Sequence, residues 1–141
     1  MQRGARIAFD YGDVRIGVAV SDPDSILASP LVTLKSNEKN LAKELTKIFQ
    51  EIEPVAVYVG RPALLSGQAG VATEKVLQFV ELLTSLTQTP IELIDERLST
   101  VSAARQLRDV GKNAKLAKEY IDMAAAVAIL DFALQIEKHK K

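Results

Sequence analysis

Four acidic residues lie within or directly after apolar stretches of the chain. Asp10 follows an apolar run, Asp95 and Glu96 together follow a second one, and Asp122 lies within a third. A carboxylate is costly to bury unless a cation or a hydrogen-bond donor meets it. Carboxylate oxygens are also the ligands that magnesium and manganese prefer. The sequence therefore predicts a metal site, provided that the fold brings these acids together.

Asp10 lies near the end of the first of two predicted strands within residues 6–22, which a turn at Gly12-Asp13 connects. β-Branched and aromatic residues dominate both strands, as is typical of a sheet. Open α/β sheets bind their ligands at the C-terminal ends of their strands, which is where this acid lies. The alternative is that Asp10 braces the turn, a common role for acids at strand ends.

Asp95 and Glu96 follow another predicted strand, Ile91–Ile94. Parallel strands end at the same edge of a sheet, so we expect this pair to approach Asp10. Neighbouring residues of a strand point to opposite faces, and only one of the two acids can share a cluster with Asp10. The alternative is an acid near the N-terminus of the next helix, where the helix dipole favours negative charge.

Asp122 lies in the last predicted helix, in register with the apolar positions that this helix is expected to bury. Those positions are Ala125, Ala126, Ile129, Phe132, Ala133 and Ile136. An acid in line with such a stripe needs a partner. The alternative is a half-exposed acid paired with Lys118 at spacing i, i+4.

Few other residues of the chain could bind a metal or take part in catalysis. There is no cysteine, and the only histidine, His139, lies in a charged tail, which argues against a zinc site or a catalytic triad. Two metal ions about 3.5–4 Å apart can hold the attacking and leaving oxygens of a phosphodiester. The acids therefore predict two Mg²⁺ or Mn²⁺ ions and hydrolysis of a nucleic acid.

Several basic residues could contact phosphates. Five are predicted to bind nucleic acid, near strand ends or before Asp122: Arg15, Arg97, Lys112, Lys115 and Lys118. For any one of them the alternative is a solvated surface charge. The formal net charge of the chain is +0, so any binding depends on such local groups.

Length and composition indicate one ordinary globular domain. The chain has 141 residues, of which 48% are hydrophobic and 26% charged. No apolar run is long enough to span a bilayer, and the first residues lack the apolar region of a signal peptide. We expect a cytoplasmic protein without membrane contact.

The periodicity of the apolar residues predicts the order β-β-β-α-β-α-β-α-α. The expected third strand is 29–34, the first helix lies within 37–52 with Asn37 as its N-cap, and the fourth strand is 55–60. A second helix precedes the strand 91–94, and helices are expected at about 99–110 and 114–137. Alternating strands and helices imply right-handed parallel crossovers. The prediction is an α/β fold, with a five-stranded mixed sheet and helices on both faces.

Three segments resemble the RuvX family, also called YqgF, of the RNase H-like superfamily, to which RuvC-type Holliday junction resolvases also belong. They are FDYGDVRIGVAVSD at 9–22, DERLST at 95–100 and IDMAAAVAIL at 121–130. The resemblance implies an RNase H-like fold with sheet order 3-2-1-4-5. Together with the length of the chain, it predicts a single nuclease domain over 1–137. The charged residues at 138–141 are expected to form a disordered basic tail.

Members of this family are described as nucleases that process the 5′ end of pre-16S rRNA. The resemblance places the metal-binding acids at Asp10, at Asp95 or Glu96, and at Asp122, with a slight preference for Glu96. It implies metal-dependent nuclease chemistry on structured RNA. The expected state is a monomer or a weak homodimer.

One segment departs from the family pattern. The loop at 61–70 reads RPALLSGQAG, with Arg61 in place of an apolar residue and no acid. This change and the neutral net charge lend some support to an RNA-binding module without catalysis. Two other functions also stay open: a junction resolvase acting on branched DNA, and a phosphotransferase of the actin and sugar-kinase type, which also opens with an Asp-x-Gly hairpin. The last of these needs two lobes, and the length of this chain argues against it.

Overall fold

The computed structural model describes residues 3–61, 71–95 and 115–139, and it describes the side chains of all of these except 71–73 and 115–122. The predicted helix at 99–110 lies outside these residues. None of the helices within the described ranges combines the length and apolar character that a membrane crossing requires.

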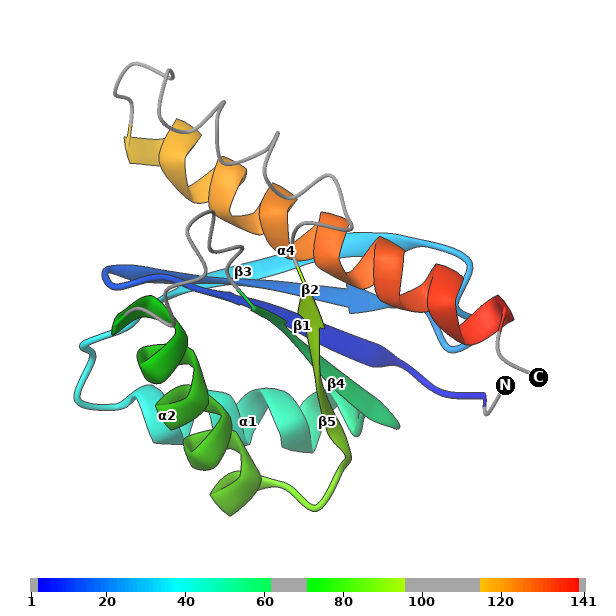
Figure 1. Cartoon of the computed structure of the whole chain (residues 1–141), viewed down its shortest axis with the longest axis horizontal. Coiled ribbons are helices and arrows are strands. Elements are labelled where there is room, and N and C mark those ends of the chain that lie inside the picture. Colours follow the sequence, from blue (N-terminus) through cyan, green and yellow to red (C-terminus); the bar gives the residue numbers. More distant parts are fainter. Residues whose placement is uncertain (1–2, 62–70, 96–114, 140–141) are drawn as a thin grey trace.

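Five strands form one mixed sheet (Figure 1). They are β1 (Arg6–Tyr11), β2 (Arg15–Ser21), β3 (Ala28–Lys35), β4 (Ala56–Arg61) and β5 (Ile91–Asp95). The strand order is β3-β2-β1-β4-β5, so β1 is central. β1–β2 and β2–β3 are antiparallel, whereas β1–β4 and β4–β5 are parallel. The predicted mixed sheet and its strand order are confirmed.

Helices cover both faces of the sheet, as predicted. α1 (Leu41–Ile52) and α2 (Val71–Leu86) pack on one face, and α4 (Lys115–His139) crosses the other (Figure 1). Both chain termini lie at the end of the molecule where α4 finishes and β1 begins (Figure 1). The acid-bearing end of β1 points the opposite way.

The core beneath α1 and α2 is built around Phe9 of the central strand. The centroid of its ring lies 6.2 Å from that of Phe49 and 5.5 Å from that of Phe79, and both pairs pack edge to face. Each such pair contributes roughly 0.5–1.5 kcal/mol beyond the burial of its area. These contacts tie both helices to β1 and make the central strand a rigid support for Asp10.

The core beneath α4 depends on small side chains. Ala125 and Ala126 of the helix and Ala8 and Ala19 of the sheet are all 0% exposed. Alanines on both surfaces let the helix backbone approach the strands closely, as the run at 124–126 predicts. Ile129, Leu130 and Leu134 continue the buried stripe toward the C-terminal end of the helix.

The strands β3, β4 and β5 begin and end within one residue of the prediction, whereas the start of α1 and the end of α4 differ by more. α1 begins at Leu41 with Asn40 as its N-cap, and Asn37 is not the cap. The preceding Ser36 is bound to the β1–β2 turn: its N–H donates to the Val14 carbonyl at 2.9 Å, and its hydroxyl donates to the Gly12 carbonyl.

The last helix is longer than predicted. α4 continues to His139, so Lys138 and His139, which were expected in a disordered tail, are helical.

Candidate active site

Asp10 occupies the predicted place near the C-terminal end of the central strand. Its side chain lies on the α4 face of the sheet, because Ala8, two residues earlier, packs against α4. Asp10 is only 2% exposed. Its partner across the β1–β2 ladder is Gly17, which adds no side chain on that side. A buried carboxylate therefore stands at the edge of the sheet where the parallel strands end.

Asp95 also lies at this edge, but on the other face. It ends β5 opposite Arg61 of β4, and its side chain is half-buried. Its neighbour Ile94 packs in the α4 core, and strand alternation therefore turns Asp95 toward the α1–α2 face. The structure thus brings Asp10 and Asp95 to one edge without placing them on one face. Glu96 lies outside the described residues.

Asp122 lies in the N-terminal half of α4, and its backbone is helical. It precedes Ala125 by three positions and Ala126 by four, and both alanines are buried against the sheet. These spacings place position 122 on the sheet-facing stripe of the helix. Its side chain is outside the described set.

The direction of α4 decides which end of the sheet Asp122 approaches. Glu137, near the end of the helix, pairs with Arg6 at the start of β1, with Nε and Oε2 3.1 Å apart. The helix therefore runs opposite to β1, and its N-terminal half lies toward the strand end that carries Asp10 (Figure 1). Asp10 and position 122 share a face and an end of the fold.

Within the described side chains, no group of three or more histidines, cysteines or acids forms a metal cluster. Of the predicted acids, only Asp10 and Asp95 belong to that set. The predicted metal site as a whole therefore stays a prediction.

The predicted nucleic-acid contacts are partly described. Arg15 begins β2, is half-buried and pairs in register with Lys35 of β3. Lys115 and Lys118 lie in the first turns of α4, with their side chains outside the described set. Arg97 and Lys112 also lie outside it. Of the described residues, Arg15 and its partner Lys35 lie at the same edge of the sheet as Asp10, because β2 begins where β1 ends.

The turn beside Asp10 is held by contacts that the sequence did not reveal. Lys75 of α2 donates to Asp13 at 2.9 Å, and this hydrogen bond raises the pKa of Lys75. The Gly12 N–H donates to the Arg15 carbonyl at 2.9 Å, which closes the turn. Gly12-Asp13 predicts a turn, but nothing in the sequence pairs it with Lys75.

Arg6 is the second residue that sequence reasoning missed. It is 1% exposed although it carries a permanent charge. The only local signal is an arginine that directly precedes the apolar run starting at Ile7. Its partner Glu137 is 131 positions away, a separation at which residue spacing predicts nothing.

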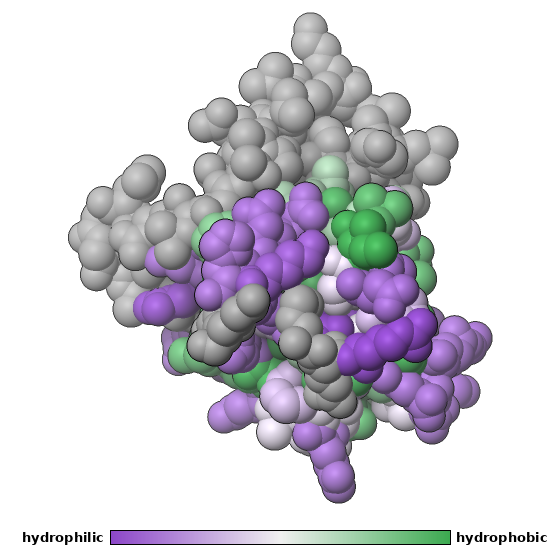
Figure 2. All heavy atoms as spheres, turned by 90° about the vertical axis from the view of Figure 1, so that its right-hand side faces the viewer, coloured by the Kyte–Doolittle hydropathy of each residue, from purple (hydrophilic) through white to green (hydrophobic). Residues whose placement is uncertain are grey.

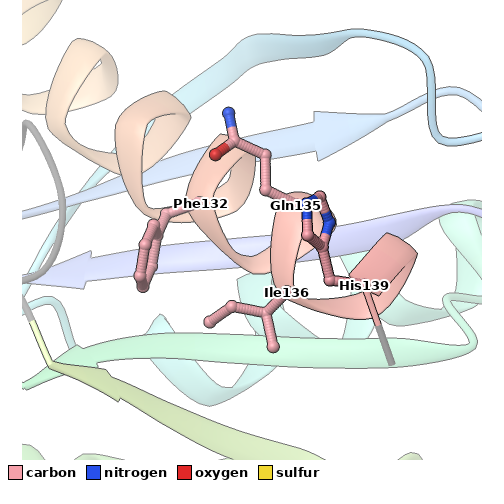
Figure 3. Close-up of a pocket in the computed structure, with 4 residues that line it drawn as sticks. All are labelled: Phe132, Gln135, Ile136 and His139. Carbon is pink, nitrogen blue, oxygen red and sulfur yellow. The ribbon is translucent and has the colours of Figure 1, made fainter. Parts of the chain in front are cut away.

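A groove of about 380 Å³ lies along the C-terminal end of α4 (Figure 3). Neither Asp10 nor Asp95, the two predicted acids whose side chains are described, lines it. Its described lining residues are Phe132, Gln135, Ile136 and His139. Phe132 and Ile136 border the buried stripe of the helix. The groove lies at the opposite end of the fold from Asp10, so it is separate from the candidate site.

Comparison with known proteins identifies the family of the chain. A model of the RuvX family, described as Holliday junction resolvase, matches residues 4–136. The chain belongs to the RuvX family. A relative from Streptomyces coelicolor, named "putative pre-16S rRNA nuclease", is 44% identical over 140 residues, which cover 98% of this chain and 84% of that protein. A Mycobacterium ulcerans relative of the same name is 46% identical over 131 residues, covering 91% and 76%.

Solved structures support the fold. RuvC from T. thermophilus, in complex with a Holliday junction substrate, aligns with a TM-score of 0.59 at 17% identity over 96% of both chains. The yeast mitochondrial Holliday junction resolvase Ydc2 aligns with a TM-score of 0.50 at 14% identity, over 96% of this chain and 80% of that one. The expected RNase H-like fold of this RuvX family member is confirmed.

Proposed function

We propose that this RuvX family member is a divalent-metal-dependent nuclease that processes the 5′ end of pre-16S rRNA. The observation that carries the proposal is the buried carboxylate of Asp10 on the central strand, with α4 running so that position 122 lies toward the same end and face. The names of the relatives supply the RNA substrate. Residues 1–137 act as one nuclease domain in the cytoplasm, as a monomer or weak homodimer.

The metal-binding acids in this proposal are Asp10, Glu96 and Asp122. Asp95 is the weaker choice, because its side chain lies on the face away from Asp10. Strand alternation would turn the residue after Asp95 toward the Asp10 face, which favours Glu96. Replacement of Glu96 by Gln is therefore expected to abolish cleavage, whereas Asp95→Asn is expected to retain it.

The donor chemistry of these acids suits Mg²⁺ or Mn²⁺. All three candidate ligands are carboxylates, the oxygen donors that hard cations prefer, and Asp10 is buried on the central strand of the sheet. When bound, two such ions supply an activated water and stabilisation of the leaving oxygen. The described residues hold Asp10 in place: β1 is packed on one face through Phe9 and on the other against the alanines of α4.

Basic residues around the site would hold the phosphate backbone. Arg15 and Lys35 lie at the strand ends next to Asp10. Arg97, Lys112, Lys115 and Lys118 are assigned to the same role by their place in the sequence. Such contacts position a nucleic acid without reading its bases, so they suit recognition of structure rather than sequence.

The test is a cleavage assay on end-labelled pre-16S leader RNA, with a four-way DNA junction alongside. Magnesium, manganese and EDTA are compared, and the variants are Asp10→Asn, Asp122→Asn, Glu96→Gln and Asp95→Asn. Asp131→Asn is the matched control, because Asp131 is an exposed acid on the same helix as Asp122. We expect metal-dependent cleavage of the RNA that is lost in Asp10→Asn and Asp122→Asn and retained in Asp131→Asn.

Two other results would redirect the assignment. Cleavage of the junction but not of the RNA would favour the resolvase activity in the description of the family model. RNA binding without cleavage, unchanged by Asp10→Asn in a protein with a wild-type circular dichroism spectrum, would favour a non-catalytic binding module.

A further inference from the structure

Arg6 is the centre of a buried polar network at the end of the fold opposite the candidate site. Its Nε and Nη2 donate to the two carboxylate oxygens of Glu137, at 3.1 Å and 3.2 Å. Its Nη1 donates to the Gly4 carbonyl at 2.6 Å and to the Ser25 hydroxyl at 2.9 Å. The guanidinium group therefore connects β1, the segment before it, the β2–β3 loop and α4.

The segments around Arg6 are themselves held in place. The Arg6 N–H donates to the Ser21 hydroxyl at 2.9 Å, and Ser21 is 4% exposed. Ser25 is 1% exposed and has a left-handed φ of 58°, a conformation that costs energy in a residue with a Cβ. Most of the described surface at this end is hydrophilic (Figure 2). Arg6 is thus fixed from several sides beneath a polar surface.

The rest of the interface between α4 and the sheet offers little to define the position of the helix along its axis. Within the described side chains it consists mostly of apolar contacts, several of them between alanines, and such contacts have no preferred direction. The Tyr58 hydroxyl of β4 is an exception, since it also hydrogen-bonds to Glu137. A bidentate arginine–carboxylate pair is directional, since two parallel hydrogen bonds must both be satisfied. This pair therefore adds a directional contact that resists sliding of the helix along the sheet.

We propose that Arg6 and Glu137 are positioning residues for the carboxylate site, although they lie far from it. The pair joins the start of β1 to the end of α4, while Asp10 and Asp122 lie toward the other ends of these two elements. Glu137 and Asp122 are separated by about 22 Å along the helix axis. A fixed anchor at one end thus sets the register of the two acids at the other.

This inference rests on the proposed nuclease function, and its test includes readouts that need no cleavage. The variants are Glu137→Gln, which removes the charge but keeps the size of the side chain, and Arg6→Lys, which keeps the charge but removes the guanidinium group that donates two hydrogen bonds to Glu137. Tyr58→Phe is the matched control: the Tyr58 hydroxyl also hydrogen-bonds to Glu137, and its loss leaves the Arg6–Glu137 pair intact.

The position of α4 is measured directly by spin labels. The chain has no cysteine, so Lys35→Cys and Gln135→Cys, both at exposed positions, supply the only labelling sites. Lys35 lies at the Asp10 end of the sheet and Gln135 near the end of α4, so their separation reports axial movement. The Mn²⁺ affinity is measured in the unlabelled proteins from the electron paramagnetic resonance signal of the free ion.

We expect the distance distribution to broaden in Glu137→Gln and Arg6→Lys but not in Tyr58→Phe. Mn²⁺ binding should weaken by about three- to tenfold in the first two variants, as when outer-shell partners of metal ligands are removed. kcat should fall by about tenfold or more, because misplacement by about 1 Å is enough to slow catalysis strongly. KM for the RNA should stay near the wild-type value, since neither residue lies near the predicted phosphate contacts.

Unchanged distances in both variants would overturn the inference, whatever happens to activity. So would broadened distances with wild-type Mn²⁺ affinity and kcat, because the anchor would then have no effect on the acids. If the wild-type protein neither binds Mn²⁺ nor cleaves RNA, the nuclease proposal fails, and the spin-label distances alone decide whether the pair holds α4 in place.

Discussion

At the scale of single residues, the turn after Asp10 depends on a position without a side chain. A Cβ atom added to Gly12 would lie 2.7 Å from the Arg15 carbonyl oxygen, a backbone atom that a rotamer change cannot move. The same carbonyl accepts the Gly12 N–H at 2.9 Å. Gly12 is therefore required for close approach of two backbone segments.

Gly12→Ala is expected to destabilise the protein by about 1–3 kcal/mol, the usual range for strain forced into a packed region. Chemical denaturation followed by circular dichroism measures this change. An alanine variant as stable as the wild type would show that the turn opens at no cost. Val14→Ala, at a 65% exposed position of the same turn, is the control.

Asp22 organises the β2–β3 loop through its carboxylate. Its Oδ1 accepts the Leu27 and Ile26 N–H groups at 2.8 Å each, and its Oδ2 accepts the Asp24 N–H at 3.1 Å. These backbone hydrogen bonds, with that from Leu27 contributing most, lower the pKa of Asp22 below its ordinary value. The charged form is thus favoured in the folded protein.

Asp22→Asn keeps the acceptor oxygen and removes the charge, so it isolates the contribution of ionisation. Because the folded-state pKa is lowered, the charge stabilises the protein above the unfolded-state pKa. This contribution disappears as the pH falls through the folded-state pKa. We expect wild type to be more stable than the variant at pH 7 and the two to converge in acid. A difference that stays constant between pH 7 and pH 2 would contradict this origin.

At the scale of elements, α1 ends at a residue whose conformation suits glycine better. Glu53 has a φ of 49° and a ψ of 59°, and its N–H donates to the Phe49 carbonyl at 2.9 Å. Left-handed geometry costs a residue with a Cβ about 1 kcal/mol. The helix thus ends with a strained cap just before Pro54.

Glu53→Gly is expected to stabilise the protein by about 0.5–1 kcal/mol, since relief of strain exceeds the added freedom of the unfolded chain. The urea midpoint should rise without a change in slope. Glu51→Gly, inside the same helix, should instead destabilise by about 1 kcal/mol. Equal effects of the two glycines would contradict the cap assignment.

α4 packs against the sheet through side chains that are fully buried. Ala126 is 0% exposed and lies on the stripe that also carries position 122. Ala126→Leu is expected to cost about 1–3 kcal/mol by overpacking and to reduce Mn²⁺ affinity by moving the helix off the sheet. Gln135→Leu, at an exposed position of the same helix, should change neither quantity by a comparable amount. Thermal denaturation and Mn²⁺ titration test both expectations.

At the scale of the whole molecule, the proposed metal site links parts of the chain that are distant in sequence. A ligand that binds only the folded protein raises the free energy of unfolding, by about 2.7 kcal/mol at a concentration one hundred times its dissociation constant. Manganese should therefore raise the melting temperature of wild type and of Asp131→Asn but not of Asp10→Asn. Equal shifts in all three proteins would indicate binding elsewhere.

Much of this fold was predictable from the sequence, because its signals are local. The types of the apolar residues predicted the hairpin, their periodicity predicted the strand at 55–60 and the helices, and their spacing in the last helix predicted the buried face of α4. The predicted start of α1 was wrong: the chain forms turns before Leu41, and the Ser36 N–H donates to the Val14 carbonyl, a contact between separate segments that residue spacing does not predict. The candidate acids were found from their apolar surroundings, which are also local.

The tertiary structure alone decided how these elements meet. It turned Asp95 away from the Asp10 face, and it paired Asp13 with Lys75 and Arg6 with Glu137. Residue spacing predicts which face of an element is buried, since the geometry of one helix or strand is fixed by its own backbone. It does not predict which distant side chain meets that face, because this depends on the packing of the complete chain. The sequence therefore determined the acids and the elements that carry them, and the fold decided which of them share a face.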